Sequence, residues 1–138
     1  MATEQQSVPI NRESPENIQS TIGSIKKMLM VGALFAAVGY LLIIGALVLE
    51  LTQFHPLLEE FFTTHTQWSL AGGGPERTSA ALNSQLATIH KFPSTLLWLK
   101  LGGIGHILVG IFIALAAIIR ALSVMPHRLS YEMERTQG

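Results

Sequence analysis

Two long apolar blocks constrain the fold of this chain more than any other feature, because neither contains Lys, Arg, Asp or Glu. The first block, Met28 to Leu49, has 22 residues, and the second, Leu101 to Ile119, has 19. As a helix, the first block would cover about 33 Å at 1.5 Å per residue, which matches the roughly 30 Å hydrocarbon core of a bilayer. Each block therefore predicts a membrane-spanning helix.

The composition agrees with this interpretation, since 49% of the residues are hydrophobic and only 13% are charged. We expect an all-α membrane protein built as a two-span transmembrane helical hairpin with short interfacial helices in the outer connection. Its segments are a polar tail with a short amphipathic helix at 1–23, a span at 24–51, an outer connection at 52–93, a second span at 94–124 and a second tail at 125–138.

Helix signals mark several of these boundaries. Ser14 followed by Pro15 is typical of a helix start. Ser94 or Thr95 should begin the second span after Pro93, and Pro126 should end it, because proline interrupts a straight helix.

Two patterns of helical spacing lie in the outer connection, separated by the loop sequence AGGGPE at 71–76. The second pattern has Thr78 or Ser79 as a possible cap. We expect each to form a short helix in the headgroup layer. The apolar faces contain Leu57, Leu58, Phe61, Phe62 and His65 in the first pattern, and Leu82, Leu86 and Ile89 in the second.

The cations near the span ends predict the orientation. More of them flank the terminal ends of the spans than the connection, so both termini should be cytoplasmic, in a bacterial inner membrane or its organelle equivalent. The terminal group is Lys26, Lys27, Arg120, Arg128 and Arg135, and the outer group is Arg77, Lys91 and Lys100. Nine cations balance nine carboxylates, which argues against nucleic-acid binding, and the absence of cysteine excludes thiol and iron–sulfur chemistry.

Small residues recur on one face of each span, as in helices that pack closely in a bilayer. This predicted small-residue seam consists of Gly32, Ala36, Gly39 and Ala46 in the first span and Gly103, Gly110, Ala114, Ala117 and Ala121 in the second. If paired residue numbers sum to about 150, Gly39 faces Gly110, and Glu50 forms an interfacial ion pair with Lys100. A partner helix that uses one stripe is the alternative interpretation.

His106 lies within the second apolar block, where both ring nitrogens of its imidazole need partners. The ring could bond a backbone carbonyl beside a glycine, the hydroxyl of Tyr40 or a group of a partner subunit. Haem ligation, quinone contact and a proton relay are the functional alternatives. No resident cofactor is predicted, because a bis-histidine haem would need a second ligand that the first span does not offer.

His55, His65 and His90 are weak candidates for copper or zinc binding, because their spacing matches no closed metal site. No nucleotide-binding, zinc-protease or nucleophile motif is present. We therefore expect a non-catalytic integral subunit that packs against larger membrane-protein subunits, in an energy-converting or oxidoreductase complex. The alternatives are a homo-oligomeric pore or transporter component, and a haem- or metal-binding electron-transfer subunit that uses His106.

Overall fold

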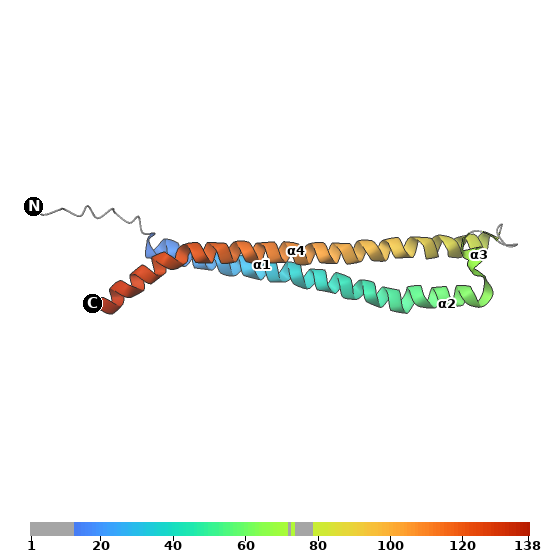
Figure 1. Ribbon diagram of the computed structural model, residues 1–138, viewed down its shortest axis with the longest axis horizontal. Coiled ribbons are helices and arrows are strands. Elements are labelled where there is room, and N and C mark those ends of the chain that lie inside the picture. The colour runs from blue at the N-terminus through green and yellow to red at the C-terminus, as the bar shows by residue number, and fades with distance from the viewer. Residues whose placement is uncertain (1–12, 72, 74–78) are drawn as a thin grey trace, which may run out of the picture. The chain divides into compact units, whose positions relative to one another are not determined.

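The computed structural model describes residues 13–71, 73 and 79–138, and in these residues it is almost entirely helical, with no strand. The α-helices are α1 (Pro15–Leu49), α2 (His55–Thr64), α3 (Gln67–Leu70) and α4 (Ala80–Gln137), and a π-helical segment, Glu50–Phe54, joins α1 to α2 (Figure 1). Two continuous helical stretches, Pro15–Thr64 and Ala80–Gln137, are long and apolar enough to cross a membrane. Most of the predicted tail at 1–23 and most of the loop at 71–76 lie outside the described residues.

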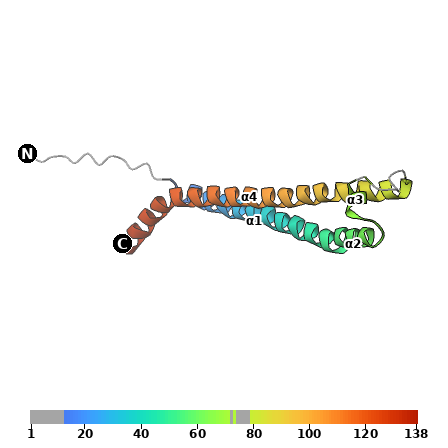
Figure 2. The ribbon, with the colours of Figure 1, turned by 45° about the vertical axis from the view of Figure 1, so that its right-hand side comes forward.

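The chain forms two compact units, each containing part of α1 and part of α4. The terminal unit comprises Met1–Gly32 and Phe112–Gly138, and the central unit comprises Ala33–Ile111. Figure 2 shows the same ribbon from a second direction. Each unit is described separately below.

Both long helices begin at hydroxyl caps. The Ser14 Oγ accepts a hydrogen bond from the Asn17 N–H at 3.3 Å, directly before Pro15. The Ser79 Oγ accepts one from the Leu82 N–H at 3.4 Å. These bonds satisfy amides that have no partner inside the helix. Ser79 is therefore the cap of the second outer pattern, whereas Thr78 lies outside the described residues.

Helix α4 passes through two prolines that were expected to interrupt it. Pro93 does not separate an outer helix from the span, and the helix does not end at Pro126. A proline removes only one backbone donor, and nearby hydroxyl groups can re-satisfy helix carbonyls. The Thr95 Oγ1 donates to the Lys91 carbonyl at 3.2 Å and the Ser123 Oγ donates to the Arg120 carbonyl at 2.7 Å. The last turns of α4, drawn in red, bend away from the preceding part (Figure 1).

The buried positions of both long helices recur every seven residues, which is the repeat of helices that pair with a left-handed supercoil. This seven-residue repeat differs from the predicted seam, because Ala36 and Ala114 are only half-buried and Ala121 is exposed. The fully buried members are Ile18, Gly32, Gly39 and Ala46 in α1 and Leu82, Ile89, Leu96, Gly103, Gly110, Ala117 and Val124 in α4.

The π-helical segment adds one residue to the repeat in the first helical stretch. Beyond Ala46 the next inward positions are Phe54 and Phe61, so the interval is eight residues across Glu50–Phe54 and seven afterwards. The His55 N–H bonds the Glu50 carbonyl, five residues earlier. Pro56 follows directly and has no N–H, so a wider turn at this place relieves its conflict with the preceding carbonyls.

The central unit brings α1 and α4 into backbone contact at Gly39 and Gly103. A Cβ atom added to Gly103 would lie 2.7 Å from the Gly39 carbonyl oxygen and 2.6 Å from the Ile43 Cγ1. A Cβ at Gly39 would lie 2.9 Å from the Ile107 N. Gly39 thus lies against Gly103 and Ile107, whereas the summed register of about 150 placed it opposite Gly110. The helices are shifted by one to two turns because each glycine accommodates an isoleucine of the other helix.

The apolar faces of the two outer patterns pack against each other. Phe61, which is 1% exposed, forms a buried cluster with Leu82, Leu86 and Ile89. Leu57, Leu58 and Leu70 pack against this cluster. The second pattern is the beginning of α4 and not a separate helix, so the expectation of two separate interfacial helices is wrong in this respect. Burial of large side chains between α2 and α4 supplies the cover that the headgroup layer was expected to give.

We predict opposite effects from alanine at two neighbouring glycines of α4. Gly103→Ala should lower the free energy of unfolding by about 1–3 kcal/mol, because the new methyl group meets the Gly39 backbone. Gly105 has open space around its Cβ position, so Gly105→Ala should be neutral or stabilising by up to about 1 kcal/mol through helix propensity. Unfolding in detergent micelles with increasing dodecyl sulfate measures both. Equal effects would contradict the close approach.

Candidate functional site

An ion pair closes one end of the glycine contact in the central unit. The Lys100 Nζ donates to the Glu50 Oε2 at 2.7 Å, and the side chains are 40% and 27% exposed. The neighbouring Phe54 and Phe92 rings are stacked, with centroids 5.4 Å apart. Phe54 also borders a small hollow of about 200 Å³ beside the pair. The structure thus brings together the two charges that were expected to pair.

The long side chains explain why this pair forms although the glycine register differs from the expected one. Glu50 and Lys100 sum to 150, whereas Gly39 and Ile107, or Ile43 and Gly103, sum to 146. A lysine stem spans more than one helical turn, so its ammonium reaches a carboxylate that is not directly opposite. Glu50 is also the first residue of the π-helical segment, where the helix is wider.

His106 bonds its own helix. Its Nδ1 lies 2.7 Å from the Gly102 carbonyl oxygen, four residues earlier, and its ring is stacked with Phe35 at a centroid distance of 5.9 Å. A carbonyl only accepts, so Nδ1 carries the proton and the neutral ring presents a lone pair at Nε2. The carbonyl beside a glycine is one of the partners that the sequence suggested. Tyr40 is exposed and is not bonded to His106 within the described residues.

The remaining ring nitrogen, Nε2, has no hydrogen-bond partner among the described residues. It is not sealed inside the protein, because the described residues contain no fully buried side-chain nitrogen or oxygen that lacks a partner. This arrangement fixes the tautomer as metal-ligating histidines require, but one imidazole supplies only one ligand. Haem, quinone and proton-relay roles of His106 therefore stay predictions.

The three outer histidines lie in different surroundings. His65 is stacked on Phe61 at 4.8 Å, and its Nδ1 lies 2.7 Å from the Thr64 Oγ1. His55 lies beside the Phe54 ring, and His90 is exposed on α4. In the part of the chain that the structure describes, no group of three His or carboxylate side chains could hold a metal ion. Metal binding by this set stays a prediction.

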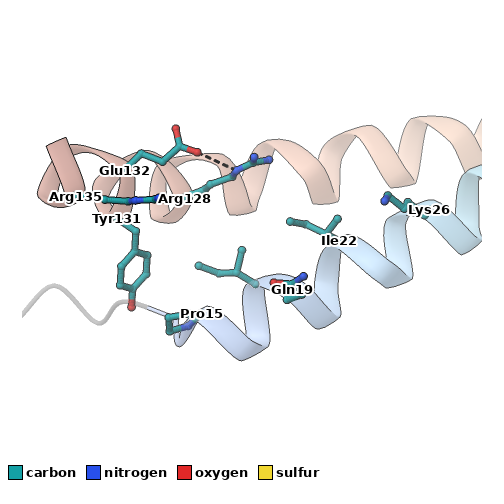
Figure 3. Close-up of a pocket in the computed structure, with 9 residues that line it drawn as sticks. Pro15, Gln19, Ile22, Lys26, Arg128, Tyr131, Glu132 and Arg135 are labelled. Atoms are coloured by element: carbon teal, nitrogen blue, oxygen red, sulfur yellow. Dashed lines mark ion pairs between the residues drawn. The ribbon is translucent and has the colours of Figure 1, made fainter.

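A groove in the terminal unit was not predicted from the sequence. It separates the beginning of α1 from the end of α4 and has a volume of about 700 Å³ (Figure 3). The cations Lys26, Arg128 and Arg135 line it, together with Tyr131, whose hydroxyl donates to the Glu13 carbonyl at 2.9 Å. The sequence used these cations only to orient the spans. Their convergence on one groove depends on how α1 and α4 pair, which the cation count did not address.

Comparison with protein-family models, with curated proteins and with solved structures finds no match to this chain. The functional argument therefore depends on the site geometry alone. That geometry provides an ion pair, a tautomer-fixed imidazole and a cationic groove.

We predict that the Glu50–Lys100 interaction tolerates reversal. Glu50→Lys and Lys100→Glu should each lower the melting temperature in detergent, because each places like charges side by side. The double exchange should recover most of the loss, since the opposite charges meet again. Arg128 and Glu132, an exposed i,i+4 pair at 3.4 Å, provide the matched control. Their exchange should change the melting temperature little. A double variant no more stable than the singles would contradict the pairing.

Proposed function

We propose that the chain is a non-catalytic integral membrane subunit that packs against and stabilises a larger membrane complex, in an energy-converting or oxidoreductase assembly. The carrying observation is that large apolar side chains are exposed beyond the apolar blocks. Phe62 in α2 is 44% exposed and Trp68 in α3 is 69% exposed. Exposed apolar groups of this size mark surfaces that another molecule covers.

The proposed topology is a transmembrane hairpin with both termini in the cytoplasm, in a bacterial inner membrane or its organelle equivalent. The cation distribution supports this orientation. Only 17% of the most apolar window in each helical stretch is buried within the chain. Lipid tails would cover side chains such as Leu41 and Phe112 in these windows, which are exposed in the structure.

Distance along the helix separates the outer apolar side chains from those that lipid covers. Phe62 lies 13 residues after Leu49, the last residue of the first apolar block. This corresponds to roughly 20 Å along a continuous helix, whereas the headgroup layer is only about 5–8 Å thick on each side. Because α2 packs on α4 through Phe61, it has a face on the protein and another that carries Phe62. A protein partner of apolar surface fits that second face.

Two helices enclose no path wide enough for a substrate of appreciable size. The packing role therefore fits the described contacts better than transport by a single chain. It also matches the ion pair and the glycine contact, which stabilise the helix pair without leaving an enclosed chamber between them.

The test is the size of the complex extracted with a mild detergent. We predict that Phe62→Gln combined with Trp68→Gln shifts the chain from a large assembly to a smaller species on native gels. Thr63→Gln combined with Thr66→Gln, at exposed positions nearby, should leave the assembly unchanged.

Other outcomes would contradict the proposal. A lone monomer from wild-type membranes would remove the partner. Self-association without other chains would favour the homo-oligomeric pore or transporter, and a haem absorbance band that depends on His106 would favour the electron-transfer subunit.

A further inference from the structure

The groove of the terminal unit is cationic at its rim and apolar at its floor. Lys26 extends from α1, and Arg128 and Arg135 extend from α4 (Figure 3). The floor includes Ile18, which is buried, and Ile22, which is half-buried. Such a surface suits a ligand that has an anionic end and an apolar end.

The charges around this groove do not cancel. Glu132 is the one carboxylate that lines it, and its Oε1 lies 3.4 Å from the Arg128 Nε. Three cations against one carboxylate leave a net charge of +2. Glu13 and Glu16 precede the groove along the chain but do not line it. An anion is therefore attracted to this place, and guanidinium groups match phosphate oxygens in a two-point geometry.

A second hollow, of about 480 Å³, adjoins the first and shares Ile22, Lys26 and Arg128 with it. Its remaining wall is apolar and includes Ile25 and Leu122. This hollow extends the groove toward the apolar blocks, since Ile118 at its edge belongs to the second block. The two hollows together are apolar on the side of the proposed span and cationic on the side of the termini.

We propose that this groove binds an anionic phospholipid, with the headgroup phosphate between Lys26 and Arg128 and an acyl chain along Ile25 and Leu122. The proposal rests on the proposed membrane orientation, which places these cations in the cytoplasmic leaflet. Lys26 lies two residues before the first apolar block, about 3 Å along the helix, where lipid phosphates lie. Cationic pockets between helices at this depth are typical sites for anionic headgroups.

A free phosphate would use only the rim of the groove. The apolar hollow would then stay empty, although its lining is as large as a lipid chain requires. The hydroxyl of Tyr131 is already engaged by the Glu13 carbonyl, so phosphate recognition depends on the cations.

The experiment titrates full-length protein in a mild uncharged detergent with phosphatidylglycerol or phosphatidylcholine and measures binding by native mass spectrometry. Wild type should prefer phosphatidylglycerol. Lys26→Gln combined with Arg128→Gln should weaken that binding by roughly tenfold to thirtyfold, as two cations of ordinary strength imply.

The matched control removes the same charge at a similar depth. Lys27 and Arg120 line neither hollow, and the Arg120 Nη1 donates to the Ser24 Oγ at 3.2 Å. Lys27→Gln combined with Arg120→Gln should change the affinity by less than about threefold. Equal losses in both double variants would show diffuse attraction and overturn the groove.

A second pair of variants tests the acyl chain. Leu122→Gln should weaken long-chain phosphatidylglycerol but not a dihexanoyl analogue, whereas Ile119→Gln, which lines neither hollow, should weaken neither. Competition by inorganic phosphate with no loss from Leu122→Gln would assign the site to free phosphate and overturn the lipid. The Phe62 and Trp68 variants lie in the central unit, so loss of the complex and loss of the lipid are separate results.

Discussion

The contact between the Gly39 and Gly103 backbones is the constraint on which the central unit depends. Neither helix could approach the other so closely if either residue had a side chain, because the added atom would meet backbone. Close approach also allows Ile43 and Ile107 to pack into the space beside the opposite glycine. In a bilayer, where apolar surface gains little by leaving lipid, such close packing is the main source of helix association.

Part of the arrangement could be predicted from the sequence. The apolar blocks predict two long helices, and the structure confirms two helical stretches of that character. The small residues indicate which faces pack, and Glu50 and Lys100 lie together as expected. The register could not be predicted, because glycines at intervals of seven allow several pairings, and the isoleucines beside them decide among these pairings.

The helix ends were the least predictable part. Pro93 and Pro126 suggested boundaries, yet α4 continues through both, because one missing N–H is a small loss in a helix that is packed along its length. Pro56 has a visible effect, since a π-helical segment precedes it. That segment adds one residue and brings Phe54 and Phe61 into the positions that face α4. The sequence shows the proline but not which accommodation the helix adopts.

The charged residues near the apolar blocks illustrate a broader limit of sequence reasoning. Counting Lys26, Arg128 and Arg135 predicts an orientation, and their identity as cations is sufficient for that purpose. Their role in binding depends on whether they converge, which the pairing of the first turns of α1 with the last turns of α4 determines. His106 shows the opposite case. Its isolation among apolar residues suggested a ligand, whereas the Gly102 carbonyl already satisfies one ring nitrogen and fixes the tautomer. A chemically unusual residue can thus have a local partner, while ordinary surface charges form the more specific site.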